Sequence, residues 1–104
     1  MLAELELIPL GQPGTSVSPL LATVARLIDA SGLDYRVGPM GTTVEGDWDQ
    51  VMALAKRCHQ ALLQSADRVL TTIKIDDRTD RPGPGRLTQK VASLEAQAGQ
   101  PLKH

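Results

Sequence analysis

Residues 38–49 read GPMGTTVEGDWD, which joins a glycine-containing turn to a short strand and then to the start of a helix. Side chains alternate between the two faces of a strand, so Val44 lies on one face and Thr43 and Glu45 lie on the other. If Val44 faces the core, the two polar side chains point away from it, where a ligand or a partner subunit can meet them. This arrangement is typical of holding a small molecule rather than of breaking one.

The residues before this stretch predict a strand, a helix and a second strand. Residues 3–10 alternate loosely between apolar and polar side chains, as strands do, and a loop follows over 11–16. Ser18 is expected to cap a helix with Pro19 at its first position and Gly32 at its end. The next short strand contains Tyr35 and Val37. The apolar stripe of the helix consists of Leu20, Leu21, Val24, Leu27 and Ile28.

The residues after this stretch predict a helix, a long strand and another helix. Asp47 and Gln50 form a predicted capping box. Residues 68–78 form the longest predicted strand, and residues 80–85, with two prolines and two glycines, interrupt the regular structure. The buried stripe of the middle helix is expected to be Val51, Leu54, Ala55, Cys58 and Leu62, and a third amphipathic helix contains Leu87, Val91, Leu94 and Ala98.

This order of elements predicts an α+β fold of the ferredoxin-like, split βαβ type, with an additional C-terminal helix. We expect one ligand-binding domain over residues 1–98, with two helices on one face of a four-stranded antiparallel sheet, and a frayed tail over 99–104. The uncovered face mixes charged, hydroxyl and apolar side chains, and such a face usually meets another copy of the chain or a ligand. It would carry Glu4, Glu6, Ile8, Thr43, Glu45, Leu70, Thr72 and Lys74.

Composition restricts the class of protein. The 104 residues suit one domain, and 41% apolar and 22% charged residues suit a soluble one. A net charge of −1 and only two aromatic residues argue against nucleic acid as a partner. The sequence lacks a signal-peptide pattern and an apolar run of membrane-spanning length, so we expect a cytoplasmic protein without a membrane partner.

The sequence predicts no metal site, no cofactor and no catalytic residue. Cys58 and His59 are adjacent on a helix, so they point about 100° apart and cannot both bind one ion. We interpret Cys58 as a core residue, because it lies on the buried stripe. We interpret the glycines of 11–14 and 83–85 as ordinary loop residues and not as a phosphate-binding fingerprint.

Glu4, Glu6 and Glu45, with Lys74 nearby, leave two interpretations open. In the first interpretation, they form ordinary cross-strand charge pairs on a solvated face, and each pair contributes a few tenths to about 1 kcal/mol to stability. Alternatively, they form a polar pocket with a carboxylate directed at a basic or cationic ring. Trp48 is likewise either a packing residue or a ring for stacking.

Four segments, in order, resemble the small thiamine-binding, YkoF-like proteins: LELIPLG (5–11), GTSVS (14–18), GPMGTTVEG (38–46) and IKIDDR (73–78). The resemblance extends from about residue 2 to residue 97, and the four motifs together are specific. It implies a ferredoxin-like fold, self-association through the sheets to homodimers or homotetramers, and binding of thiamine or its hydroxymethylpyrimidine moiety. Proteins of this family are binders rather than known enzymes.

The resemblance also implies which residues bind the ligand. A carboxylate such as Glu45 would accept a charge-assisted hydrogen bond from the aminopyrimidine, and hydroxyls would satisfy the rest of the ring edge. Met40, Leu70 or Trp48 would lie against the ring, and the acids would disfavour phosphorylated analogues. Glu45→Gln is expected to weaken thiamine binding at least about tenfold, or about 1.4 kcal/mol. The implied set is Thr15, Ser16, Thr42, Thr43, Glu45, Lys74 and Asp76.

We therefore expect a homo-oligomer that binds thiamine or a related pyrimidine to sequester, carry or sense it, without covalent chemistry. One alternative is a small isomerase-type enzyme at a dimer interface, with Glu45 as the general base. The other alternative is an assembly module without a ligand, in which the open sheet face only joins subunits.

Overall fold

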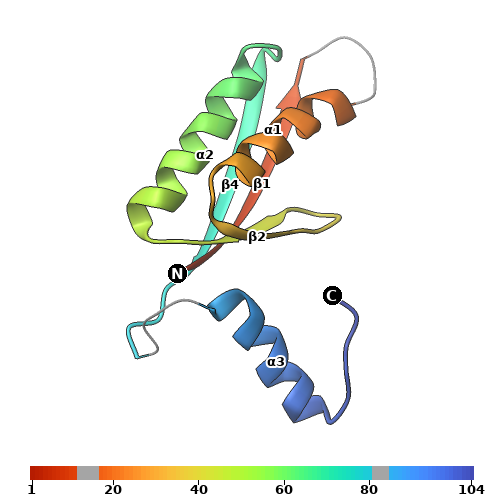
Figure 1. The fold of residues 1–104 in the computed structure, drawn as a ribbon. Coiled ribbons are helices and arrows are strands. Elements are labelled where there is room, and N and C mark those ends of the chain that lie inside the picture. The colour runs from red at the N-terminus through yellow and green to blue at the C-terminus, as the bar shows by residue number, and fades with distance from the viewer. Residues whose placement is uncertain (12–16, 81–84) are drawn as a thin grey trace.

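The computed structural model describes residues 1–11, 17–80 and 85–104. Among the described residues, no helix is both long and apolar enough to cross a membrane. The elements are β1 (Leu2–Leu10), α1 (Ser18–Ala30), β2 (Asp34–Val37), β3 (Thr42–Glu45), α2 (Trp48–Leu63), β4 (Arg68–Asp76) and α3 (Arg86–Ala98) (Figure 1).

The four strands form one sheet in the order β2-β3-β1-β4, and every neighbouring pair is antiparallel. Helices α1 and α2 lie together against one face of this sheet (Figure 1). The order and the directions of the strands confirm the predicted ferredoxin-like α+β fold.

The core lies between these two helices and the sheet, and it is aliphatic. Val44 is fully buried, which confirms the predicted alternation along β3. Cys58 is also fully buried among apolar side chains, and burial raises the pKa of its thiol. The core therefore includes the complete predicted stripe of α2, which is Val51, Leu54, Ala55, Cys58 and Leu62.

The helix ends combine confirmed and corrected predictions. The predicted capping box is present, because the Gln50 amide donates to Asp47 Oδ1 at 2.8 Å and the Asp47 amide donates to Gln50 Oε1 at 3.0 Å. The prediction that Ser18 caps α1 is wrong, since Val17 holds that position and Ser18 is already helical. Gly32 follows α1 with φ +78°, the left-handed conformation expected there.

Strand β4 is two residues shorter than predicted. It ends at Asp76, which lies opposite Leu2, the first residue of β1. Beyond that point β1 offers no strand partner, and the Arg78 side chain instead donates from Nε to Asp80 Oδ1 at 3.0 Å. Where the neighbouring strand begins therefore decides where β4 ends.

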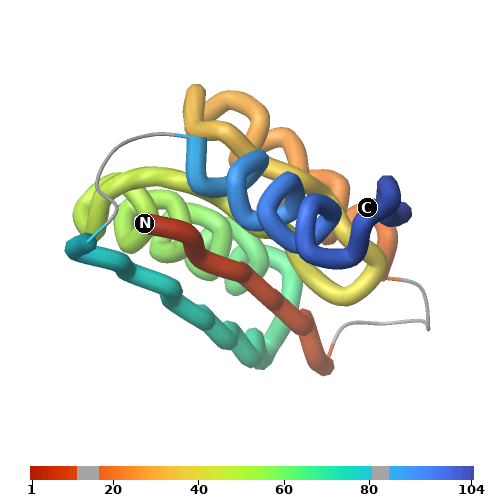
Figure 2. Tube along the Cα trace, turned by 90° about the horizontal axis from the view of Figure 1, so that it is seen from below, coloured from red at the N-terminus to blue at the C-terminus, as the bar shows by residue number. Residues whose placement is uncertain are grey.

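Helix α3 does not join the other two helices. It lies beyond the end of the sheet where β1 begins, and the chain then turns back toward the sheet (Figures 1 and 2). The tail over 99–104, which was expected to be frayed, contacts α3 at Glu95, where the Leu102 amide donates to Oε2 at 2.7 Å. The open face of the sheet is thus partly overhung by α3.

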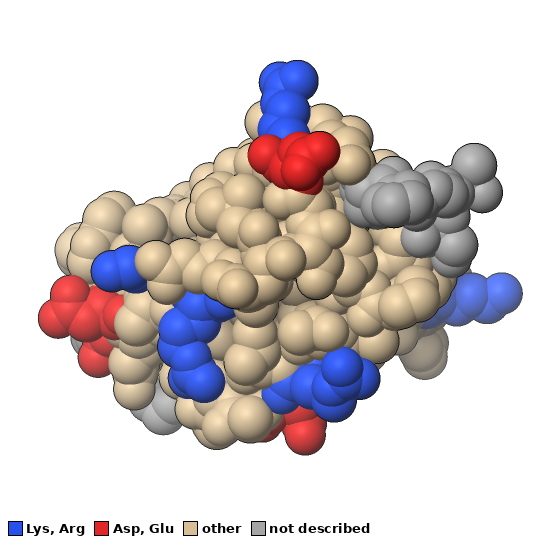
Figure 3. Space-filling view, turned by 90° about the horizontal axis from the view of Figure 1, so that it is seen from above, with Lys and Arg blue, Asp and Glu red and all other residues tan. Residues whose placement is uncertain are grey.

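The opposite end of the molecule shows how the surface charges are distributed. Viewed from above (Figure 3), basic and acidic side chains are scattered over this end, with broad uncharged areas between them. This distribution is in keeping with the net charge of −1.

Candidate functional site

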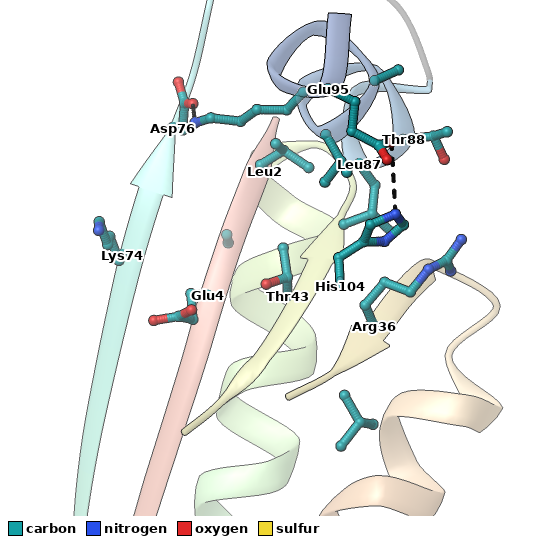
Figure 4. A pocket seen from close by; sticks show the side chains of 15 residues that line it. Leu2, Glu4, Arg36, Thr43, Lys74, Asp76, Leu87, Thr88, Glu95 and His104 are labelled. Carbon is teal, nitrogen blue, oxygen red and sulfur yellow. Dashed lines mark hydrogen bonds and ion pairs between the residues drawn. The ribbon is translucent and has the colours of Figure 1, made fainter. Parts of the chain in front are cut away.

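A groove of about 670 Å³ lies where the open face of the sheet meets α3 (Figure 4). Strands β1, β3 and β4 form its floor, β2 forms one edge, and α3 with the end of the chain forms a wall. We call it the α3 groove. It is lined by Leu2, Ala3, Glu4, Arg36, Val37, Thr43, Lys74, Asp76, Leu87, Thr88, Lys90, Val91, Ala92, Glu95 and His104.

A row of four polar side chains crosses the floor of the α3 groove. The strand register places Arg36 opposite Thr43, Thr43 opposite Glu4, and Glu4 opposite Lys74. Directly opposed residues of antiparallel strands have Cβ atoms about 4.5–5.5 Å apart. The row thus sets donors and acceptors side by side across all four strands.

Three members of this row keep their polar groups available. Within the described ranges, the side chains of Glu4, Thr43 and Lys74 form no hydrogen bond and no ion pair, although Glu4 and Lys74 are directly opposed. Arg36, the fourth member, donates from Nη1 to the carbonyl oxygen of its neighbour Tyr35 at 2.8 Å. The predicted cross-strand charge pairing is therefore not formed, and the row can bind an external group.

Apolar side chains complete the end of the groove beneath α3. Leu2 is buried on the floor, although it lies on the open face of the sheet. Leu87, Val91 and Glu95 follow one another at four-residue spacing, so they share one side of α3, which faces the groove. The groove thus joins an apolar wall to a polar floor, which is the usual composition of a small-molecule site.

Glu45 occupies a different place from the one expected for a ligand-binding carboxylate. It is only 9% exposed, and its two oxygens accept from the amides of Gly85 and Leu87 at 2.8 and 2.7 Å. These amides belong to the N-cap and the first turn of α3, where unpaired N–H groups and the helix dipole favour a negative charge. Glu45 thus ties β3 to α3 and is absent from the groove lining.

Asp76 forms a second tie between the sheet and α3. Lys90 Nζ donates to Asp76 Oδ2 at 2.5 Å, and Figure 4 shows this contact at the edge of the groove. This hydrogen bond lowers the pKa of the Asp76 carboxyl, and the positive charges of Lys90, Arg86 and Arg78 lower it further. The charged Asp76 side chain therefore lines the groove and also contacts α3 through Lys90.

The structure brings together only part of the predicted site. Thr43, Lys74 and Asp76 line the α3 groove. Thr42 belongs to a separate cavity of about 310 Å³ beside the β2–β3 turn and α1. Thr15 and Ser16 lie outside the described residues.

Several groove residues were missed because their positions depend on where α3 packs. Leu87, Val91 and Glu95 were expected on a helix, but the spacing of apolar residues does not say which surface a helix contacts. Arg36 had a usable signal, since it alternates with the half-buried Tyr35 on β2. His104 is placed by the returning tail, with its Nε2 3.8 Å from Glu95 Oε1.

The charge and shape of the groove differ from the acidic receptor expected from the sequence. Glu4, Asp76 and Glu95 are balanced by Arg36, Lys74 and Lys90, so the lining is mixed in charge. None of the expected ring-contacting residues, Met40, Leu70 and Trp48, lines it. Within the described parts of the chain, no group of three or more His, Cys, Asp or Glu side chains is placed to hold a metal ion.

Comparison with known proteins gives matches over most of the chain. Residues 3–95 match the family described as Thiamine-binding protein. A UPF0045 protein of Methanothermobacter thermautotrophicus is 44% identical over 95 residues, covering 89% of this chain and 94% of the relative. A UPF0045 protein of Synechocystis is 35% identical over 96 residues, covering 91% and 77%.

Solved structures share the fold as well. The hypothetical protein MJ1052 of Methanocaldococcus jannaschii superposes with a TM-score of 0.81 at 32% identity, covering 89% of this chain and 93% of that one. A Thermotoga maritima protein, to which a role in thiamine biosynthesis or salvage is ascribed, gives a TM-score of 0.75 at 25% identity, covering 89% and 96%. From the family match and these relatives, the chain belongs to the thiamine-binding protein family.

Proposed function

We propose that this protein binds thiamine, or its hydroxymethylpyrimidine moiety, in the α3 groove and releases it unchanged. The observation that carries this proposal is the polar row formed by Arg36, Thr43, Glu4 and Lys74 under the apolar side of α3. Family membership and the role ascribed to the Thermotoga maritima neighbour support the choice of ligand.

The chemistry of the groove suits this ligand. Thiamine has a cationic thiazolium ring and an aminopyrimidine ring with both donors and acceptors. The Glu4 carboxylate accepts from the exocyclic amine or from a protonated ring nitrogen, and the Thr43 hydroxyl both donates and accepts. Leu87 and Val91 cover a ring face, and the groove volume of about 670 Å³ lies within the range of small-molecule sites.

In this proposal, Glu4 takes the ligand-binding role that the sequence suggested for Glu45. Glu4 is exposed on the groove floor without a partner among the described residues, whereas both oxygens of Glu45 are engaged by α3. Because Glu45 is directed at α3, it is badly placed to act as the general base of an isomerase. Retention of the ligand, for sequestration, carriage or sensing, is thus favoured over its conversion.

The remainder of the open sheet face supports self-association. Ile8 and Leu70 are opposed on neighbouring strands and are 38% and 50% exposed, and Leu10 lies next to them on the same face. An apolar patch of this kind on a charged sheet is typical of an interface between copies. We propose that a second copy packs on this patch and closes the open side of the α3 groove, giving homodimers or homotetramers.

Isothermal titration calorimetry with thiamine tests the proposed site. Glu4→Gln is expected to weaken binding at least about tenfold, or about 1.4 kcal/mol, because a charge-assisted hydrogen bond is lost. Glu6→Gln is the matched control, since Glu6 lies two residues along the same face but does not line the groove. Equal affinities of the Glu4→Gln variant and the unmodified protein would remove Glu4 from the site.

Mass spectrometry of the ligand after incubation tests binding without conversion. Thiamine recovered intact and in full supports a binding protein. A change in its mass that requires the folded protein would favour an enzyme instead.

A further inference from the structure

A second cavity adjoins the α3 groove on the far side of the Asp76–Lys90 ion pair. Its volume is about 160 Å³, which is enough for several water molecules or for one tetrahedral oxyanion. Asp76 and Lys90 line both cavities, so the two are neighbours. We call it the cation pocket, and it is lined by Asp76, Arg78, Arg86, Gln89, Lys90 and Ser93.

Arg86 is the unusual member of this pocket. Its residue is only 9% exposed, yet within the described chain its guanidinium forms no hydrogen bond and no ion pair. The Asp76 carboxylate attracts this guanidinium at longer range without accepting a hydrogen bond from it. A buried guanidinium without a hydrogen-bond acceptor is costly, because its N–H groups have lost water and gained no acceptor in its place. An oxyanion in the pocket would supply the missing acceptor.

The other donors surround the same space. Gln89, Lys90 and Ser93 follow Arg86 by three, four and seven residues, which places all four on one side of α3. Arg78 comes from the segment after β4, where its guanidinium is already paired with Asp80. Three cations thus face one carboxylate, Asp76, whose pKa is lowered by the Lys90 hydrogen bond and also by the charges of Arg86 and Arg78.

We propose that the cation pocket binds a phosphoryl group, with Arg86 as its buried anchor. A guanidinium matches two phosphate oxygens with two parallel N–H groups, and Lys90 adds a point charge. The Ser93 hydroxyl and the Gln89 amide provide uncharged donors. This assignment departs from the expectation, drawn from the acids in the sequence, that phosphorylated analogues would be repelled.

The phosphoryl group has two sources. It is inorganic phosphate, or it is the phosphate of an ester whose organic part occupies the α3 groove. The second source rests on the proposed function, because it needs thiamine monophosphate to lie with its ring in the groove and its phosphate past Lys90. The first source needs only the cation pocket.

Titrations of inorganic phosphate, thiamine and thiamine monophosphate, followed by calorimetry and ³¹P NMR, test the proposal. Arg86→Gln is expected to weaken both phosphate-containing ligands at least about tenfold. The control Lys56→Gln removes a positive charge from the exposed side of α2 and is expected to leave every affinity unchanged. Failure of both phosphate-containing ligands to bind the unmodified protein would overturn the proposal, as would equal phosphate affinities in Arg86→Gln and the unmodified protein.

Thermal unfolding without ligand separates a binding role of Arg86 from a purely structural one. If the guanidinium is kept for a ligand, Arg86→Gln raises the melting temperature of the free protein while phosphate binding is lost. A lowered melting temperature with unchanged phosphate affinity would assign Arg86 to structure alone and overturn the proposal. Arg78→Gln is a second variant should Arg86→Gln fail to fold, and is expected to weaken phosphate about threefold or more, since Arg78 lies at the exposed end of the pocket.

The same titrations keep this proposal apart from the proposed function. Tighter binding of the monophosphate than of thiamine or phosphate assigns the pocket to an ester of the groove ligand. Equal binding of phosphate and the monophosphate assigns it to free phosphate. Binding of phosphate without any binding of thiamine would support the cation pocket and contradict the vitamin-binding proposal. Binding of thiamine without any binding of phosphate or of the monophosphate would support the vitamin-binding proposal and contradict the cation pocket.

Discussion

At the scale of single residues, Glu45 is a carboxylate that holds a wall of the candidate groove without lining the groove itself. Its two oxygens accept from the amides of Gly85 and Leu87, which lie 40 and 42 residues further along the chain. Helix α3 has no side-chain cap of its own, because its N-cap is Gly85, in a left-handed conformation with φ 92°. Glu45 therefore replaces a local cap with one supplied by the sheet.

Glu45→Gln tests this structural role. The amide side chain has a single oxygen, so one of the two α3 amides loses its acceptor, and we expect a loss of about 1–3 kcal/mol in the free energy of unfolding. Urea unfolding followed by the fluorescence of Trp48, the single tryptophan, measures it. Thiamine affinity should fall together with stability, because α3 is a wall of the groove. A drop in affinity with unchanged stability would instead mean that Glu45 contacts the ligand directly.

The strand residues were the most predictable part of the site. Alternation correctly separated Val44 from Thr43 and Glu45, because a strand has only two faces. It did not predict that the Glu45 carboxylate turns to α3, since nothing near position 45 identifies amides so distant in sequence. Alternation also assigned Glu4 to the open face. It did not predict that Glu4 lies in a row with Arg36, because that depends on the register between strands.

At the scale of secondary structure, α3 is held by polar contacts that come from several parts of the chain. Glu45 binds its first turn, Asp76 binds Lys90 in its second, and its own Glu95 accepts from the Leu102 amide of the returning tail. The apolar rhythm of residues 87–98 predicted the helix but not its location. Leu94 is 59% exposed, so this rhythm overstated how much of α3 is buried.

The Asp76–Lys90 contact gives α3 a dependence on pH. The pKa of Asp76 is lowered in the folded protein, first by the hydrogen bond from Lys90. The contribution of the Asp76 charge to the free energy of unfolding is therefore fully present above the pKa of an unfolded aspartate, about 3.9. It is lost as the pH falls through the lower pKa that Asp76 has in the folded protein. The free energy of unfolding of the unmodified protein should exceed that of Asp76→Asn at pH 6, and the difference should shrink toward pH 2.

Hydrogen exchange of the α3 amides locates this effect. At pH 6 the amides of α3 in Asp76→Asn should exchange faster than those of the unmodified protein, whereas the amides of α2 should not differ. A constant stability difference between pH 6 and pH 2 would show that the Asp76 charge does not hold α3.

At the scale of the whole molecule, the fold followed from the order of elements, whereas the groove did not. Strand, helix, strand, strand, helix and strand admit few compact arrangements, and the observed sheet order β2-β3-β1-β4 is that of the predicted ferredoxin-like fold. The groove exists because an additional helix overhangs a face that the basic fold leaves open. No local pattern specifies that contact, so the cavity was predicted only as an uncovered surface.

The apolar part of the open face should govern association between copies. Leu70→Lys places a charge in the patch formed with Ile8 and Leu10, and it is expected to shift the protein toward the monomer without unfolding it. Leu94→Lys is the control, because Leu94 is similarly exposed but lies on α3, away from the patch. Sedimentation velocity measures both. An unchanged oligomer in Leu70→Lys, or a monomeric unmodified protein, would argue against this interface.

The most direct test of the central claim is a thiamine titration followed by amide chemical shifts in ¹⁵N-labelled protein. Binding in the α3 groove predicts the largest shifts at Glu4, Thr43 and Lys74 on the floor and at Leu87 and Val91 on α3. The separate cavity lined by Thr42 and Met40 should show little change. Saturable shifts confined to that separate cavity, or no shifts at millimolar thiamine, would contradict the account.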